Sequence, residues 1–470
     1  MRAIAINRSV LEMEYAIRGP IPQRAAQLAR EGREIIPCNI GNPLALGQQP
    51  LTYYRQVLSL LEDPSRIRRE RTLLAGGGAP DPDAPDEYTL GTAEDMLQQL
   101  KAGTGAYSES QGALFIREAV AAFIDRRDGV SATGQKADPD HIFLTNGASE
   151  GVRNVLELLI TGPADGIMIP IPQYPLYSAT IRRCGGIQVN YYPDEDREWS
   201  LTREELERAR ARAAKQGVRV RALVVINPGN PTGAILDEAT QATVVDFAEA
   251  HGIAILADEV YQDNVYGGTF VSFAKMVGGR NVPLFSFHSV SKGFFGECGH
   301  RGGYMEVRNP PAVEGSSCTL LDVLIKQASV SLCSNTIGQI LVGLAVQPPP
   351  PGTPPYARFA RERECILADL REKAGIIKAA FPRMAGVHCF GRTGAMYLFP
   401  RLERLPAGTN DFEYCMALLE ETGLCTVNGA GFGQKAGTHH MRIAFLPSQQ
   451  ELSAVLDRWI EFHNRYCTAG

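Results

Sequence analysis

A lysine in a serine- and glycine-rich segment has the clearest chemical potential in this sequence. Lys292 stands in the run Ser289 to Gly293, directly after an apolar stretch, and Arg301 follows in a second glycine-rich run. A lysine amine that is partly desolvated beside positive charge loses its proton readily and can attack an aldehyde to form an imine. A lysine in such a loop is more often a solvated surface residue. The assignment therefore depends on the other motifs.

Two upstream motifs favour the chemical interpretation of this lysine. The run Asn227 to Gly233 follows one strand-like segment, and the run Ala257 to Tyr261 follows the next. Ligands in open α/β sheets bind beyond the carboxyl ends of the strands, so Asn230, Asp258 and the lysine are expected at one edge. A carboxylate there can keep a pyridine nitrogen protonated, which makes the ring an electron sink. This ordered set is typical of an enzyme that uses pyridoxal phosphate.

The individual assignments each compete with a structural alternative. Asp258 would otherwise cap the following helix. Tyr261 and Asn230 are predicted to hydrogen-bond the phenolic oxygen of the cofactor, although Tyr261 could also be a core tyrosine bonded to backbone. Tyr174 could stack on the pyridine ring or simply pack in the core.

The phosphate of the cofactor needs an anion site, and two features offer one. The run Asn146 to Gly151 lies between a strand-like and a helical pattern, so its backbone amides and the Ser149 hydroxyl can hold an oxyanion at a helix N-terminus. Ser289 and Arg301 are predicted to supply further contacts, because a guanidinium group can bind phosphate through two hydrogen bonds.

An arginine in an apolar segment is the candidate for binding the substrate. Arg442 lies within the strand-like run His439 to Phe445. A buried charge needs a partner. The partner is either a structural carboxylate or the α-carboxylate of the substrate, which Asn230 and the Gly41 amide would then help to bind.

The elements that position these residues indicate an α/β fold. Short β-rich runs alternate with helical patterns, which predicts a mostly parallel seven-stranded sheet covered by helices. The candidate strands are His141 to Thr145, Ile167 to Ile171, Ile187 to Tyr192, Ala222 to Ile226, Ile253 to Ala257, Leu284 to His288 and Gly303 to Val307.

A proline-rich run predicts the boundary between two domains. Residues 347–355 can neither continue a helix nor supply the amides of a central strand. We expect an N-terminal segment, residues 1–70, that packs with the small domain, a large cofactor-binding domain at 71–346 and a small α+β domain at 347–470. Strand-like runs at Val387 to Phe390, Ala395 to Phe399 and Met441 to Phe445 belong to the small domain.

Bulk properties narrow the partners. The 470 residues are 44% apolar and carry a net charge of −5, and no basic stripe suited to nucleic acid is evident. The 10 cysteines form no CxxC pair, which argues against a zinc site or a disulfide framework. No window has the length and apolarity of a membrane span, and the first residues do not read as a leader. We therefore expect a soluble cytoplasmic protein that binds neither nucleic acid nor membrane.

The chain resembles the fold-type I pyridoxal phosphate enzymes, and within them the alanine aminotransferase group of class I, which includes glutamate–glyoxylate aminotransferase. The resemblance covers almost the whole chain. It rests on the runs Asn39 to Pro43, Gly47 to Thr52, Gly105 to Ser108, Pro172 to Ser178, Asn227 to Gly233, Val290 to Gly303 and Gly431 to Gln434.

The resemblance implies a role for each matching position. Lys292 would form the imine and carry the proton, Asp258 would pair with the ring nitrogen, and Tyr107 would reach the phosphate of a neighbouring subunit, which implies a homodimer. The implied catalytic residues are Lys292, Asp258 and Tyr261. The remaining cofactor contacts would be Asn230, Ala148, Ser149, Tyr174, Ser289, Arg301 and Tyr107, and the substrate contacts Arg442, Asn230 and Gly41.

The activity implied is transamination of L-alanine and 2-oxoglutarate to pyruvate and L-glutamate, by a ping-pong route through pyridoxamine phosphate. Glutamate–glyoxylate exchange is the alternative. A lyase on the same cofactor is less favoured, and its release of ammonia without an acceptor acid would distinguish it. A non-catalytic cofactor-sensing domain is also less favoured, because residues 1–60 lack a helix-turn-helix pattern and a basic face. Three stretches depart from the family pattern and leave the acceptor preference open: Arg66 to Glu94, Gly391 to Thr393 and Asn428 to Ala430. Arg18 could lie near the site or form a structural salt bridge, and the sequence does not decide between these roles.

Overall fold

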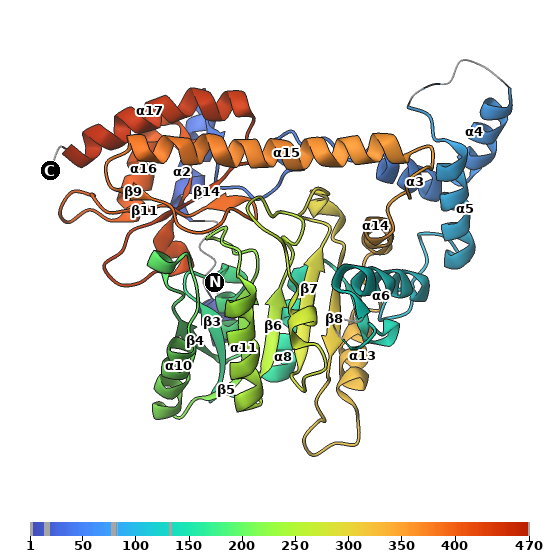
Figure 1. Ribbon diagram of the computed structural model, residues 1–470, viewed down its shortest axis with the longest axis horizontal. Helices are drawn as coiled ribbons and strands as arrows, with labels where there is room; N and C mark the ends of the chain where they lie inside the picture. The colour runs from blue at the N-terminus through green and yellow to red at the C-terminus, as the bar shows by residue number, and fades with distance from the viewer. Residues whose placement is uncertain (1–2, 14–18, 77–80, 82, 131–133, 469–470) are drawn as a thin grey trace.

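A seven-stranded sheet forms the centre of the protein. The computed structural model describes residues 3–13, 19–76, 81, 83–130 and 134–468. The strand order is β2-β8-β7-β6-β5-β3-β4 (Figure 1). The strands are β2 (Ile142–Thr145), β3 (Asp165–Pro170), β4 (Ile187–Tyr191), β5 (Arg219–Ile226), β6 (Ala254–Asp258), β7 (Leu284–Ser289) and β8 (Gly303–Arg308).

The sheet is mostly parallel, as the sequence predicts. Strand β8 alone among the seven runs antiparallel to both of its neighbours, β2 and β7, whereas β3 to β7 pair in parallel. All seven strands match the predicted runs, with differences only at their ends. Apolar side chains on both faces explain the fit, because a strand covered on both sides reads as a continuous apolar run.

Helices cover both faces of this sheet. One face packs against α10 (Arg203–Lys215), α11 (Glu238–His251) and α12 (Phe273–Val277). The other packs against α8 (Ala148–Leu159), α9 (Pro175–Arg183) and α13 (Leu320–Val330). At the β2–β8 end a further core joins α3 (Thr52–Glu62), α5 (Glu87–Leu100), α6 (Leu114–Asp128) and α14 (Thr336–Val346).

A smaller α+β layer lies against the strand ends. The long helix α15 (Tyr356–Ala380) runs across the molecule from the large layer into the small one (Figure 1). It packs with α2 (Pro20–Arg30), α16 (Asp411–Thr422) and α17 (Gln449–Thr468) around one core. Three small sheets complete this layer: β1 (Ile36–Pro37) with β12 (Leu424–Cys425), β9 (Val387–His388) with β11 (Arg401–Leu402), and β10 (Tyr397–Leu398) with β14 (Met441–Ala444) and β13 (Val427–Asn428).

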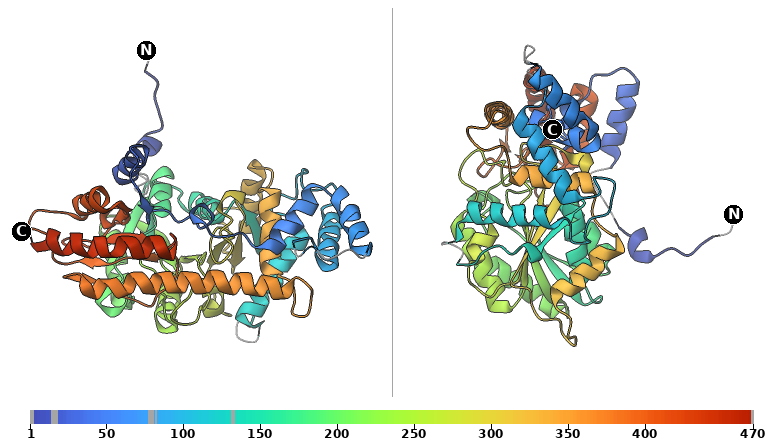
Figure 2. Two further views of the ribbon diagram at one scale, coloured as in Figure 1. Left: turned by 90° about the horizontal axis from the view of Figure 1, so that it is seen from above. Right: turned by 90° about the vertical axis from the view of Figure 1, so that its right-hand side faces the viewer.

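The N-terminal segment divides between the two layers. Ile21 and Ile36 belong to the core of the small layer, whereas Tyr54 and Ile67 pack with α5 and α14 in the large one. The sequence-based prediction assigned all of residues 1–70 to the small layer, and the contacts of α3 and α4 (Ser65–Ala75) differ from it. The first helix, α1 (Arg8–Leu11), projects from the body (Figure 2).

Some segments singled out in the sequence lie between helices or outside the residues that the structure describes. Arg18 and much of the glycine- and proline-rich loop after α4 lie outside the described residues. The proline-rich run 347–355 separates α14 from α15. Within the described ranges, none of the helices has the length and apolar character that a bilayer span requires.

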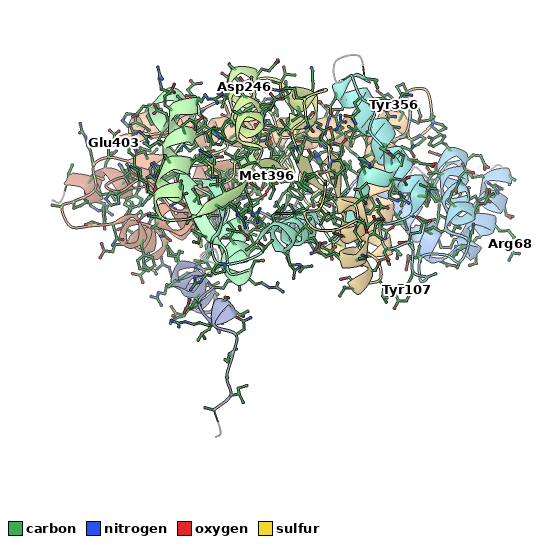
Figure 3. The ribbon with its side chains drawn as sticks, turned by 90° about the horizontal axis from the view of Figure 1, so that it is seen from below. Arg68, Tyr107, Asp246, Tyr356, Met396 and Glu403 are labelled. Carbon is green, nitrogen blue, oxygen red and sulfur yellow. The ribbon has the colours of Figure 1, made fainter. Side chains whose placement is uncertain are left out.

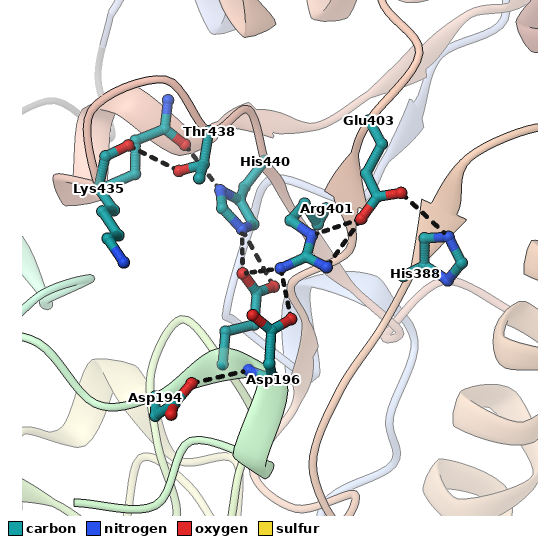
Figure 4. A network of polar contacts seen from close by, with 10 residues as sticks. Asp194, Asp196, His388, Arg401, Glu403, Lys435, Thr438 and His440 are labelled. Atoms are coloured by element: carbon teal, nitrogen blue, oxygen red, sulfur yellow. Dashed lines mark hydrogen bonds and ion pairs between the residues drawn. The ribbon is translucent and has the colours of Figure 1, made fainter.

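A polar network connects the two layers (Figure 4). His440, in the small layer, lies 3.0 Å from the carboxylate of Glu195, which follows β4 in the large layer. Arg401 donates to Asp196 at 2.9 Å and to the same Glu195 at 3.2 Å. Because His440 immediately precedes β14, these contacts fix the start of the strand that carries Arg442.

Candidate active site

Lys292 lies in the loop that follows β7. Its Nζ donates to the Gly41 carbonyl at 2.5 Å and lies 5.9 Å from the centre of the Tyr261 ring. The next residue, Gly293, has φ +67, and a Cβ there would lie 3.0 Å from an oxygen of Asp263. Glycine is therefore required for the turn that presents the lysine beside β6.

Asp258 ends β6 and is buried, with 5% of its surface exposed. The Tyr177 hydroxyl donates to its Oδ2 at 2.9 Å. Its Oδ1 has no hydrogen-bond partner among the described residues. Burial raises the pKa of Asp258 from 3.8 to about 6, although Tyr177, the Val260 backbone and Lys292 each oppose the rise. One oxygen of the carboxylate therefore has no hydrogen-bond donor among the described residues, and a protonated ring nitrogen would supply one.

Asn230 and Tyr261 are neighbours, as the sequence predicts. The Asn230 amide donates to the Tyr261 hydroxyl at 3.5 Å. Both side chains are buried, Tyr261 at 2% exposure. They come from the loops after β5 and β6, which pair in parallel, so their proximity follows from strand order.

Arg442 has no carboxylate partner among the described residues. Its guanidinium donates to Asn230 Oδ1 at 3.2 Å and to the Asn39 carbonyl at 2.9 Å. The rings of Tyr397 and Phe432 lie 4.3 and 4.7 Å from the guanidinium carbon. A buried charge held only by neutral groups is well suited to an anionic ligand. The geometry therefore argues against the alternative of a structural ion pair.

The N-terminus of α8 and Arg301 form one anion-binding corner. Ala148 and Ser149 begin α8 after Gly147, which has φ +74. Arg301 donates to the Asn146 carbonyl at 2.9 Å and to Ser149 Oγ at 3.3 Å. A Cβ on Gly147 would lie 2.5 Å from a guanidinium nitrogen, so only glycine leaves this space open.

Ser289 lies beside this corner rather than directly in it. Its hydroxyl donates to Ser291 Oγ at 3.0 Å and to the Gly302 carbonyl at 3.1 Å. Arg301 contacts the same Ser291 hydroxyl at 3.5 Å. Arg301 itself has φ +54, a left-handed conformation that is uncommon for a residue with a Cβ.

Two predicted residues remain to be placed. Tyr174 is half-buried, precedes α9 and packs against the core cluster of that helix. Tyr107 is 77% exposed and lies at the edge of the molecule (Figure 3). It is the one predicted cofactor residue that this chain leaves largely exposed on its surface.

Comparison with known proteins identifies the family of this site. The family described as aminotransferase class I and II matches residues 84–458. The chain belongs to the class I and II aminotransferases. It is 42% identical to glutamate–glyoxylate aminotransferase 1 of Arabidopsis thaliana over 98% of this chain and 96% of the relative. It is 43% identical to alanine aminotransferase 1 of Homo sapiens, over 98% and 94%.

The fold comparison agrees. The solved structure of an alanine aminotransferase from Pyrococcus furiosus has a TM-score of 0.78 and 25% identity, covering 98% of this chain and all of the other. The family uses pyridoxal 5'-phosphate, as the sequence predicts. The residues present fit that cofactor: the orphaned Asp258 oxygen suits its ring nitrogen and the corner at Arg301 its phosphate.

Sequence reasoning missed two residues of this aminotransferase site. Tyr177 bonds Asp258, and Tyr397 lies between Lys292 and Arg442, with its hydroxyl 3.4 Å from that of Tyr261. Tyr177 has a weak signal, because it follows a proline-rich turn after β3. Tyr397 has none, since its place depends on how the small layer packs against the strand ends.

Proposed function

We propose that this protein is an alanine aminotransferase, which exchanges the amino group of L-alanine with 2-oxoglutarate to give pyruvate and L-glutamate. The observation that carries the proposal is Arg442, a buried cation without a carboxylate partner, directed to the same site as Lys292. Relatives named alanine aminotransferase support the substrate class. The relatives named glutamate–glyoxylate aminotransferase support glyoxylate exchange as the second candidate.

Each residue has a task that its position permits. Arg442 binds the α-carboxylate, and Asn230 accepts a hydrogen bond that holds the guanidinium in place. The Gly41 backbone borders the substrate space beside Lys292. Lys292 accepts the α-proton and returns it, because its amine is the basic group that faces this space. When bound, the cofactor supplies an electron sink that makes this proton removable.

The cofactor contacts follow the same geometry. Asp258 would hold the ring nitrogen through the oxygen that has no hydrogen-bond partner among the described residues, and Tyr177 keeps the carboxylate in place. Asn230 and Tyr261 would bond the phenolic oxygen, and Tyr174 would stack on the ring. Ala148, Ser149 and Arg301 would hold the phosphate, which the helix N-terminus and the guanidinium charge favour. Ser289 would reach the phosphate only if its hydroxyl left Ser291 and the Gly302 carbonyl.

We also propose that the protein is a homodimer. The segment around Tyr107 lies beside the end of α13, where the Ser329 hydroxyl donates to Ser110 at 3.1 Å. Five apolar side chains in and around these two segments are exposed, and we call them the apolar patch: Tyr107, Leu114, Ile325, Val330 and Leu332. Exposed patches of this kind are typical of protein interfaces. A cytoplasmic location stays a prediction from the sequence.

Initial rates separate the candidate substrates. Purified protein saturated with pyridoxal phosphate is given L-glutamate with either pyruvate or glyoxylate, and 2-oxoglutarate release is followed. Faster turnover with pyruvate supports the alanine assignment, whereas a clear preference for glyoxylate moves it to the second candidate. Absence of turnover with both acceptors contradicts both. Lys292→Ala serves as the inactive control, since it removes the basic group.

A further inference from the structure

Tyr397 reaches the site from a segment that is held between the two layers. The Gly394 amide donates to the Gly233 carbonyl at 2.7 Å, and the Ala395 amide to the Asn264 carbonyl at 2.9 Å. Ala395 is fully buried and has φ +53, a left-handed conformation that persists only where the surroundings enforce it. The backbone that delivers Tyr397 is therefore fixed by both layers.

The ring of Tyr397 is confined on several sides. It meets the Tyr261 ring edge-to-face, with centroids 5.9 Å apart at 83°. The Arg442 guanidinium carbon lies 4.3 Å from its centroid. Only 2% of the residue is exposed. Close packing of this kind leaves the ring no second position, so the hydroxyl has a defined location.

That hydroxyl lies beside the reactive amine. A Cβ on Gly41 would lie 2.1 Å from the Tyr397 hydroxyl oxygen and 3.3 Å from Lys292 Nζ. The hydroxyl and the amine therefore lie on the same side of Gly41. An amino acid whose carboxylate contacts Arg442 and whose α-carbon faces Lys292 would therefore lie next to this hydroxyl.

The hydroxyl can donate a hydrogen bond in that direction. Without the cofactor, Tyr261 is the donor in the pair of tyrosines. When Tyr261 bonds the cofactor instead, Tyr397 still keeps its own proton for another acceptor. Burial opposes ionisation of Tyr397, yet the charges of Lys292 and Arg442 and the bond from Tyr261 lower its pKa overall, while Cys298 acts in the other sense. A more acidic hydroxyl is a stronger donor to an anion.

We propose that the Tyr397 hydroxyl is a second recognition group for the substrate α-carboxylate, to which it donates a hydrogen bond while Arg442 supplies the charge. The inference rests on the proposed aminotransferase reaction, in which this carboxylate must be held near Lys292. It adds a hydroxyl donor to the groups already assigned to this carboxylate, which are Arg442, Asn230 and the Gly41 backbone.

The test compares Tyr397→Phe with wild-type holoenzyme. The probe is propionate, which has the carboxylate and methyl group of alanine but no amino group to react. Its binding is followed by the absorbance of the bound cofactor and by competition with L-alanine. A hydrogen bond to a charged group is worth about a ten- to hundredfold change in affinity, so the Kd of propionate should rise by that factor. The KM for L-alanine should rise with it, and kcat should change less.

Tyr53→Phe is the matched control, because its hydroxyl bonds Thr92 at 3.2 Å, outside the site. This variant should bind propionate as the wild type does, and thermal unfolding checks that both variants fold. Equal propionate affinity in wild type and Tyr397→Phe overturns the inference and leaves the proposed function standing. Failure of wild-type holoenzyme to convert L-alanine contradicts both, whereas conversion of L-alanine without propionate binding overturns the inference alone.

Discussion

One oxygen of Asp258 accepts a hydrogen bond from the Tyr177 hydroxyl at 2.9 Å, while the other has no partner within the described chain. The carboxylate is therefore held in one orientation, with its second oxygen directed at a space that must supply a donor. Such a residue costs stability until the donor arrives, because an ionised carboxylate is unfavourable in a buried position.

Replacing Asp258 by Asn should remove the stability cost of burying this carboxylate and, at the same time, impair cofactor binding. The pKa of Asp258 in the folded protein, about 6, exceeds the ordinary 3.8. The contribution of Asp258 to the free energy of unfolding is therefore fully present below pH 3.8 and is lost as the pH rises to 6. At pH 7.5 the cofactor-free variant should be more stable than cofactor-free wild type, by up to about 3 kcal/mol. Urea unfolding measures the difference.

The same variant should bind the cofactor more weakly and lose turnover by orders of magnitude, since a neutral amide does not keep the ring nitrogen protonated. Asp246→Asn, an exposed change (Figure 3), should leave stability, cofactor binding and turnover nearly unchanged. A cofactor-free Asp258→Asn protein that is less stable than wild type would show that the carboxylate has a structural role.

Arg301 should contribute to the binding of pyridoxal phosphate but not to the binding of pyridoxal, which lacks the phosphate. Its guanidinium contacts Ser149 at the start of α8, so Arg301→Gln should weaken pyridoxal phosphate binding about ten- to hundredfold. Binding of pyridoxal, which lacks the phosphate, should change little. Titration of cofactor-free protein with each compound gives the two affinities. Arg68→Gln, on the distant helix α4, is the control, and an equal loss for both compounds would contradict a phosphate contact.

The central sheet could be predicted because its strands are buried on both faces and read as apolar runs between helical patterns. Residues at the ends of those runs, Asp258 and Lys292 among them, could be predicted with the strands. Their local sequence already places them at the sheet edge, and the parallel pairing of β6 with β7 brings them together.

Tyr397 could not be predicted in the same way. It lies on a two-residue strand, and its neighbours Lys292 and Gly41 come from other parts of the chain. The choice between an ion pair and a ligand site at Arg442 also required knowledge of every group around it. The contacts of α3 with α5 and α14 were hidden for a similar reason, because an amphipathic helix does not specify which core it joins.

Substitutions in the apolar patch should produce a monomer if the proposed dimer uses it. Val330 is 86% exposed, and Val330→Asp places a charge where a dimer would bury an apolar side chain. Sedimentation velocity should show a dimer for wild type and a smaller species for the variant, with weaker cofactor binding because Tyr107 loses its neighbour. Leu73→Asp, an equally polar change at the exposed end of α4, should remain dimeric. A dimeric Val330→Asp protein would exclude this patch.

Glu259, next to Asp258, should give the stability of the protein a distinct pH dependence. Burial raises its pKa from 4.5 to about 8, and repulsion from Asp128 and Glu306 adds to this, while Arg127 and the Phe273 amide oppose it. The folded protein therefore retains a proton that the unfolded chain releases, and stability from this group is lost as pH rises from 4.5 to 8.

Glu259→Gln should remove this dependence, because the amide carbonyl can still accept the bond from the Phe273 amide, which measures 2.7 Å in the wild type. The free energy of unfolding of the variant should rise relative to wild type by up to about 1.4 kcal/mol for each pH unit within the window. Urea unfolding at several values between pH 5 and 8 measures this slope. Glu118→Gln, on the exposed side of α6, should follow the wild type throughout. Parallel curves for wild type and Glu259→Gln would mean that Glu259 is already ionised in the folded protein.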